Sequence, residues 1–202
     1  MAYTILVRKN KSPIPKSEGA PDNMKKVLII STTRRKNGNS AVLAKEFERG
    51  AKDAGHEVEY VSLVDKSINF CIGCFACTKT EKCFMHDDAS EIVEKMRYAD
   101  VIVFATPIYS NQMCGSMKTL LDRTNPIFLA DYRFREIYLL TTAAVNDEKV
   151  PDGAVAGIQG WIDCFRKSAL KGVIRGVGID GIGEAEKNTR ILSMTYEMGR
   201  NI

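Results

Sequence analysis

The sequence predicts an α/β protein in which a parallel sheet carries helices on both faces. Two observations lead to this fold class. Short segments rich in apolar and β-branched residues alternate along the chain with longer segments whose apolar residues recur at helical spacing. Two of the short segments, residues 27–30 and 101–105, are apolar throughout, as expected of strands buried on both faces. Such alternation implies parallel strands joined by right-handed crossovers.

The first three elements are indicated by their composition. Residues 25–31 begin with two lysines and continue as an apolar run, which predicts the first buried strand. Ser40 is expected to cap a helix whose apolar residues follow helical spacing, and Gly55 is placed to end it. Residues 57–64 mix charged and apolar side chains, which indicates a more exposed edge strand.

The rest of the chain continues the alternation. Asp87 or Asp88 is expected to cap a helix that carries Ile92, Val93 and Met96, and residues 101–105 follow as a second fully buried strand. The remaining predicted elements are a helix at residues 116–123, a strand at 136–142, a helix at 153–170, a strand at 173–179 and a helix at 184–198. Five strands and five helices are therefore expected.

Composition excludes several classes of protein. Of the 202 residues, 45% are hydrophobic and 27% are charged, and no apolar run approaches the ~20 residues of a membrane-spanning helix. Residues 1–26 carry six basic and two acidic side chains, which account for the whole net charge of +4. The remainder gives no reason to expect nucleic acid or an anionic membrane. We expect a cytoplasmic protein with one domain at residues 25–202, preceded by a basic, proline-containing extension at residues 1–24.

Polar loops that follow buried strands are the first places to look for chemistry, because ligands of open α/β sheets bind beyond the carboxyl ends of the strands. The loop at residues 31–40 offers hydroxyls, several cations and backbone N–H groups at a helix N-terminus, which suits a phosphate. It lacks the G-x-G-x-x-G pattern of dinucleotide folds and the G-x-x-x-x-G-K pattern of P-loops. An ordinary polar strand-to-helix loop is the alternative.

A second loop, at residues 106–113, comes directly after a buried strand. Pro107 is expected to end that strand, Tyr109 supplies an aromatic face, and the Ser-Asn-Gln run at residues 110–112 offers hydrogen bonds to the edges of a planar heterocycle. A polar turn with one tyrosine is the alternative.

Four of the six cysteines lie in one 13-residue window with the spacing Cys71-x₂-Cys74-x₂-Cys77-x₅-Cys83. Without a recognisable export signal, such clustering favours a metal or redox site over disulfides. Thiolates so spaced suit a [4Fe–4S] cluster, which takes four cysteine ligands. Reduced thiols without a metal are the alternative. Zinc ranks third, because structural zinc sites usually pair two well-separated Cys-x-x-Cys knuckles.

These runs bring the sequence close to a known family. Residues 32–40, 71–88 and 99–123 together resemble the NAD(P)H-dependent FMN reductase family of flavodoxin-like proteins. The cysteine window is similar to that of the iron–sulfur flavoprotein branch of this family. The three motifs occur in the family's order, and the resemblance covers residues 25–145.

The resemblance implies a flavodoxin-like three-layer αβα sandwich with a five-stranded parallel sheet in the order 2-1-3-4-5. It also implies that FMN is held by the loops after strands one, three and four. The positions that match the family's FMN-binding residues are Thr33, Arg35, Asn39 and Ser40 for the phosphate, Pro107, Tyr109, Ser110, Asn111, Gln112 and Met113 for the isoalloxazine ring, and Thr142, Ala143 and Ala144 after the fourth strand. The chain departs from the family at residues 32–34, where Gly-Ser-Pro is usual, and at residues 143–144, where glycines are common.

The function implied by the resemblance is an FMN-dependent oxidoreductase that passes electrons from NAD(P)H to a small acceptor such as a quinone or free flavin. Because the flavin itself carries that chemistry, no catalytic side chain is expected. The family also implies a homo-oligomer, a dimer or a tetramer. The alternative is an electron carrier that holds FMN and a [4Fe–4S] cluster and exchanges electrons with a ferredoxin-like partner. A flavin- or metal-binding module without enzymatic activity is the third reading.

Overall fold

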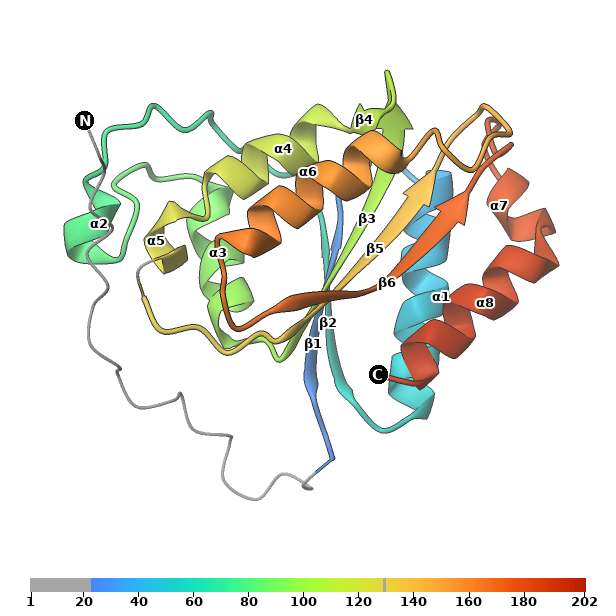
Figure 1. The fold of residues 1–202 in the computed structure, drawn as a ribbon, viewed down its shortest axis with the longest axis horizontal. Coiled ribbons are helices and arrows are strands. Elements are labelled where there is room, and N and C mark those ends of the chain that lie inside the picture. The colour runs from blue at the N-terminus through green and yellow to red at the C-terminus, as the bar shows by residue number, and fades with distance from the viewer. Residues whose placement is uncertain (1–22, 129) are drawn as a thin grey trace.

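The computed structural model describes residues 23–128 and 130–202, so the expected extension at residues 1–24 lies almost entirely outside the described residues. Figure 1 shows a twisted sheet between two layers of helices. The parallel strands are β1 (Lys26–Ser31), β2 (Glu57–Ser62), β3 (Val101–Tyr109), β5 (Glu136–Thr142) and β6 (Ala169–Gly176). Their order is β2-β1-β3-β5-β6, which confirms the predicted order 2-1-3-4-5 of the parallel strands. A short additional strand, β4 (Gln112–Met113), pairs antiparallel with β3.

Helices cover both faces of the sheet. One face carries α1 (Asn39–Asp53) and α8 (Thr189–Arg200), which lie side by side in Figure 1. The other face carries α3 (Asp88–Tyr98), α4 (Gly115–Asp122) and α6 (Asp152–Asp163). Three helices of four residues complete the described chain: α2 (Cys77–Thr80), α5 (Asn125–Phe128) and α7 (Glu184–Lys187). Among the described residues, no helix is both long enough and apolar enough to cross a membrane.

Strand β1 shows how one sheet builds two hydrophobic cores. Successive side chains of a strand point to opposite faces. Leu28 and Ile30 therefore pack with α3 and its neighbours, while Val27 and Ile29 pack with α1. All four side chains are at most 2% exposed. The continuous apolar run is thus explained by burial on both faces, as the sequence predicts.

Helix α6 and strand β6 differ from their predicted bounds. The sequence predicts a helix over residues 153–170, but α6 ends at Asp163 and β6 already begins at Ala169. The turn between them is set by tertiary contacts, because Phe165 turns back into the core at 2% exposure and the Lys167 N–H donates to the Tyr132 hydroxyl at 3.1 Å. No glycine or proline marks this helix end in the sequence.

The predicted C-terminal helix is also interrupted. It is divided into α7 and α8 at Asn188, whose side chain accepts a hydrogen bond from the Ile191 N–H at 3.1 Å and so caps α8. Asparagine is a favoured N-cap residue, because its side-chain oxygen satisfies an N–H that has no partner within the helix.

Helices α1 and α8 approach closely through a pair of glycines. A Cβ atom added to Gly199 would lie 2.3 Å from the carbonyl oxygen of Phe47, and one added to Gly50 would lie 2.1 Å from the carbonyl oxygen of Tyr196. Both contacts are with backbone, which does not rotate away as a side chain does. The packing of α8 on α1 therefore requires glycine at both positions.

We expect Gly199→Ala to lower the free energy of unfolding by about 1–3 kcal/mol, the usual cost of overpacking a close contact. Chemical denaturation followed by circular dichroism measures this change. Gly160→Ala is the matched control, because no atom lies within 4 Å of the Cβ it would add to α6, and alanine favours a helix over glycine. Equal stabilities for the wild type and Gly199→Ala would contradict the close approach.

Candidate functional site

The loops that follow β1 and β3 meet at one edge of the sheet, since the carboxyl ends of neighbouring parallel strands lie together. The Thr32 N–H donates to the carbonyl oxygen of Ala105 at 2.9 Å, and the Thr32 hydroxyl lies 3.2 Å from Cys114 Sγ. The Cys114 N–H donates to Thr106 Oγ1 at 3.1 Å. Cys114 is 3% exposed, so these contacts join the two loops within the core.

The loop after β1 folds tightly against the start of α1. A Cβ on Gly38 would lie 2.7 Å from Thr33 Oγ1, and the same hydroxyl accepts the Arg35 N–H at 3.2 Å. Gly38 is the N-cap of α1, so no side chain caps the helix, and its first turn contains no acidic residue. The first N–H groups of a helix have no partner within it, and the helix dipole favours negative charge there. This end of α1 is therefore suited to an anion.

The Ser40 side chain adds a hydroxyl to the N–H groups at the start of α1. The sequence predicts Ser40 as the N-cap, which is wrong, because the helix begins at Asn39 and Ser40 lies inside its first turn. The Ser40 hydroxyl is buried and has no hydrogen-bond partner among the described residues. Buried polar atoms in native proteins nearly always have a partner. The residues present therefore fit a bound phosphate, whose oxygens would provide one.

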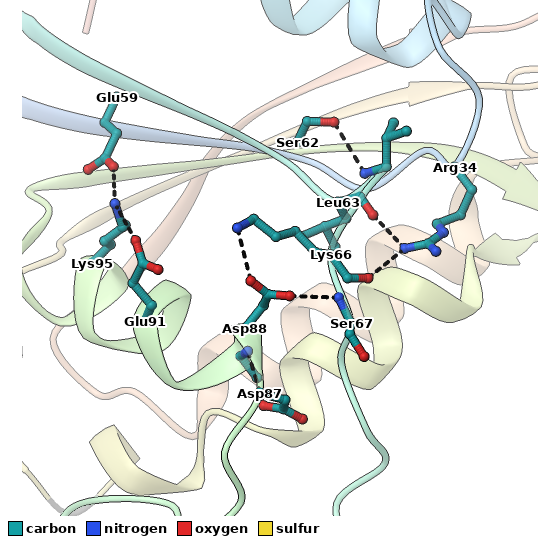
Figure 2. A network of polar contacts seen from close by, with 12 residues as sticks. Arg34, Glu59, Ser62, Leu63, Lys66, Ser67, Asp87, Asp88, Glu91 and Lys95 are labelled. Atoms are coloured by element: carbon teal, nitrogen blue, oxygen red, sulfur yellow. Dashed lines mark hydrogen bonds and ion pairs between the residues drawn. The ribbon is translucent and has the colours of Figure 1, made fainter.

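The exposed arginines of this loop have different surroundings. Arg34 donates to the backbone carbonyl oxygens of Leu63 and Lys66, as Figure 2 shows, so its guanidinium group holds the segment after β2. Arg35 and Lys36 line an open cleft of about 610 Å³ beside α1. Arg34 was not singled out by sequence reasoning, because nothing in a run of cations shows which of them has a partner.

Asn39, the third predicted phosphate residue, uses its side chain elsewhere. Its Nδ2 donates to the carbonyl oxygen of Gly181 at 2.9 Å, and its Oδ1 accepts the Ala185 N–H at 3.2 Å. The side-chain amide thus ties the first turn of α1 to the segment around α7. A contact between Asn39 and a phosphate would come from its backbone N–H.

The predicted ring-binding loop is a β-hairpin. Strand β3 continues to Tyr109, which pairs with Gln112 across a two-residue turn. The turn residues Ser110 and Asn111 have φ angles of 50° and 60°, the left-handed values that a two-residue hairpin of the primed type requires. Pro107 does not end the strand, because it lies within β3 in register with Thr142. Met113 is buried, whereas Tyr109 is 51% exposed and presents its ring at this edge.

Helix α6 supports the hairpin from one side. A Cβ on Gly153 would lie 2.3 Å from the carbonyl oxygen of Asn111, and a Cβ on Gly157 would lie 2.7 Å from the end of the Met113 side chain. Glycine at position 153 lets the hairpin backbone approach α6 so closely, and glycine at position 157 leaves room for the end of the Met113 side chain. The position of residues 110–112 is therefore fixed by packing as well as by the turn.

The loop after β5 lies beside the hairpin, because Thr142 pairs in register with Pro107. Thr142 and Ala143 are buried, and Ala144 is exposed. The Ala143 N–H donates to the carbonyl oxygen of Gly176 at 2.8 Å, and its carbonyl oxygen accepts the Ile179 N–H at 2.8 Å. The three predicted groups of FMN-binding residues thus lie at the carboxyl ends of β1, β3 and β5.

The four clustered cysteines line one small pocket of about 20 Å³, together with residues from the end of α4 and the start of α5. Burial raises the pKa of the Cys77 thiol, and the neighbouring Cys83, Cys71 and Cys74 raise it further. In the described part of the chain, no three histidine, cysteine or acidic side chains are grouped tightly enough to hold a single metal ion. A cluster is a larger group than one ion, and each of its four irons takes its own thiolate.

The cysteine-bearing segment comprises residues 63–87, between β2 and α3. Its start is fixed by an ion pair as well as by the hydrogen bonds from Arg34. Lys66 Nζ and the Ser67 N–H both donate hydrogen bonds to the Asp88 carboxylate, at 2.9 and 2.7 Å (Figure 2). The hydrogen bond from Lys66 is the largest cause of the lowered pKa of Asp88. The first loop, the segment after β2 and the start of α3 are therefore connected by one set of polar contacts.

A buried ion pair between Arg123 and Asp87 holds the rest of this segment. The two side chains are 1% and 3% exposed, and their closest nitrogen and oxygen atoms are 2.6 Å apart. Asp87 also caps α3 by accepting the Ala89 N–H, as predicted, and it accepts the Asn69 N–H at 2.8 Å. Burial opposes ionisation of Asp87, but the hydrogen bonds from Arg123, Asn69 and Ala89 outweigh it and lower its pKa. Sequence reasoning missed this pair, because its members lie 36 residues apart.

We expect Asp87→Asn to lower the free energy of unfolding by about 3 kcal/mol at pH 7, because it leaves a buried guanidinium without its charged partner. The folded-state pKa of Asp87 is below its ordinary value of 3.8, so the stabilisation is complete above that pH and is lost as the pH falls through the folded-state pKa. Urea denaturation measures the free energy of unfolding, and the difference in this quantity between wild type and variant should be smaller at pH 3 than at pH 7.

Asp88→Asn is the matched control, because it removes the neighbouring carboxylate, whose partner Lys66 is half-exposed. We expect a far smaller loss for this exposed pair. Similar losses for the two variants, or a difference that does not depend on pH, would show that the buried pair does not stabilise the fold.

Comparisons with known proteins agree with this geometry. Residues 25–148 match the family model described as NADPH-dependent FMN reductase, a range that contains the three loops and all four clustered cysteines. An iron–sulfur flavoprotein of Methanocaldococcus jannaschii is 39% identical over 102 residues, which are 50% of this chain and 53% of that protein. One from Archaeoglobus fulgidus is 37% identical over 110 residues, which are 54% of each chain. This chain thus matches about half the length of these relatives.

Solved structures show the same fold at low sequence identity. An NAD(P)H:quinone oxidoreductase from Methanothermobacter marburgensis superposes with a TM-score of 0.69 at 16% identity, covering 88% of this chain and 96% of that one. An azoreductase from Bacillus anthracis gives a TM-score of 0.67 at 17% identity, covering 89% and 100%. From the extent of the family match, supported by the flavodoxin-like architecture, the chain belongs to the NADPH-dependent FMN reductase family.

Proposed function

We propose that this protein binds one FMN where the loops after β1, β3 and β5 meet, and that it passes electrons from NAD(P)H to a small acceptor such as a quinone or free flavin. The observation that carries the proposal is the start of α1, where the buried Ser40 hydroxyl has no partner in the described chain and no side chain caps the helix. A flavin phosphate suits such a position. The family match over the same residues supports FMN as the ligand.

The chain's own residues would divide the work of binding between the two ends of the flavin. Thr33, Ser40 and the first N–H groups of α1 would hold the phosphate, with Arg35 as the charged donor. The hairpin at residues 107–113 and the loop at 142–144 would orient the isoalloxazine ring. When bound, the flavin supplies the hydride and electron transfer, so the protein contributes position and electrostatics.

We expect Arg35→Ala to weaken FMN binding roughly ten- to a hundredfold, because a charge-assisted hydrogen bond to a phosphate contributes about 1.5–3 kcal/mol. Fluorescence titration of apo-protein with FMN measures the dissociation constant. Riboflavin is the matched control ligand, because it lacks the phosphate; we expect it to bind the wild type more weakly than FMN does and to be unaffected by Arg35→Ala. An unchanged FMN affinity would remove Arg35 from the site.

A second candidate function is favoured by the cysteine pocket. Here the same flavin site would be accompanied by a [4Fe–4S] cluster on Cys71, Cys74, Cys77 and Cys83, and the protein would exchange electrons with a ferredoxin-like partner. Two observations support it. The four cysteines line one pocket, and two of their sulfur atoms already accept hydrogen bonds, Cys83 from Arg123 Nη2 at 3.4 Å and Cys71 from Asn125 Nδ2 at 3.8 Å. Two relatives named iron–sulfur flavoproteins match about half of the chain.

Replacing one cysteine separates the two candidates. In protein expressed anaerobically with iron, we expect Cys74→Ala to abolish iron and acid-labile sulfide while FMN stays bound, because the flavin loops do not include that residue. Cys164→Ala is the matched control: Cys164 is also exposed, lies outside the window, and donates to the carbonyl oxygen of Gly160 in its own helix. If the wild-type protein contains no iron, the second candidate is excluded and the flavin reductase without a cluster remains.

The electron donor is a separate question with a direct assay. Steady-state oxidation of NADPH or NADH with a quinone supports the first candidate. Reduction of the bound flavin by ferredoxin, together with failure of both nicotinamides, supports the second.

A further inference from the structure

Arg123 is the residue whose surroundings the flavin site does not explain. It is the C-cap of α4 and is 2% exposed, so its charge is removed from water. Arginine is almost never buried unless its N–H groups find acceptors. The described contacts of Arg123 show where those acceptors lie.

Its guanidinium group makes contacts on two sides. Toward Asp87 it makes the two parallel hydrogen bonds of a fork, at 2.6 and 2.9 Å. Toward the cysteine-bearing segment it donates from Nη1 to the carbonyl oxygen of Asn69 at 2.8 Å and from Nη2 to Cys83 Sγ at 3.4 Å. The Asp87 carboxylate therefore fixes the plane of the guanidinium group. The guanidinium group in turn holds the backbone at Asn69, which precedes the four cysteines, and the side chain of Cys83, which is the last of them.

One N–H of Arg123 is left over. The Nε atom is buried without an acceptor among the described residues, and Arg123 lines the same pocket as the four cysteines. A buried donor without an acceptor has a cost, and a sulfur-rich group bound in that pocket would reduce it. This observation points to a ligand independently of the cysteine spacing.

We propose that Arg123, held by Asp87, is a positioning residue for a [4Fe–4S] cluster, and that its N–H donation to sulfur raises the reduction potential of that cluster. This inference rests on the second candidate function. Reduction adds negative charge to the cluster, and hydrogen bonds to sulfur and local charge are among the factors that set its potential. The positive end of the Arg123–Asp87 pair lies on the sulfur side, because the guanidinium stands between the carboxylate and Cys83 in the hydrogen-bonded chain.

The test is a redox titration of anaerobically reconstituted protein, with the cluster followed by electron paramagnetic resonance and FMN by its absorption. We expect Arg123→Gln to lower the cluster potential by an amount equivalent to about a tenfold change in the electron-exchange equilibrium, ~59 mV for a one-electron couple. The FMN potential should change far less. The double variant Asp87→Asn with Arg123→Gln should show the same lowering, and it leaves no buried carboxylate unpaired if the single variant folds poorly.

Arg97→Gln is the matched control. Arg97 also joins the cysteine-bearing segment to the body of the protein, through Glu81 at 3.1 Å, but its described contacts include no sulfur. We expect this variant to keep the wild-type cluster potential. If loss of Arg123 prevents cluster assembly while FMN and the fold are retained, and Arg97→Gln assembles normally, the positioning role is supported.

Two results would overturn the inference and are distinguishable from each other. A wild-type protein that assembles no cluster would remove the second candidate function and the inference with it. A loaded wild-type protein whose cluster potential is the same in both Arg123 variants, or is lowered equally by Arg97→Gln, would remove the inference alone.

Discussion

The register of the parallel strands is the constraint on which the candidate site depends. Three loops that are distant in sequence reach one edge because β1, β3 and β5 are neighbours that run in the same direction. Burial on both faces keeps that register, since a slip would place apolar side chains against the wrong helices. The contacts of Cys114 with Thr32 and Thr106 then join the first two loops within the core. The sheet thus holds the polar side chains of the three loops in a defined place.

The cysteine-bearing segment has no such sheet to hold it. Between β2 and α3 its only helix among the described residues has four residues, and its position depends instead on buried and half-buried polar contacts. Arg34 links it to the proposed phosphate loop, and the Arg123–Asp87 pair links it to α3 and α4. One connected set of polar contacts therefore links the proposed FMN site to the proposed cluster site. In it, the cysteine-bearing segment is held by ion pairs with residues at the ends of α3 and α4.

Much of the fold was predictable, because apolar runs and helical spacing report burial directly. The strand at residues 136–142 and the buried starts of β1 and β3 follow from such runs. The end of α6 at Asp163 was not predictable, because the helix is ended by the tertiary packing of Phe165 and not by a glycine or proline that the sequence would show. For the site, residue types at loop positions indicated a phosphate, but which polar groups have partners depends on residues far away. Arg34, Asn39 and Arg123 are three such cases, and none of their partners is visible in a single sequence.

The proposed function depends on FMN binding where the three loops meet. The most direct measurement is the absorption spectrum of anaerobically purified protein, with flavin, iron and acid-labile sulfide quantified on the same sample. We expect flavin bands equivalent to one FMN per chain, and we expect denaturation to release the flavin in its phosphorylated form. A colourless protein that takes up no added FMN would contradict it.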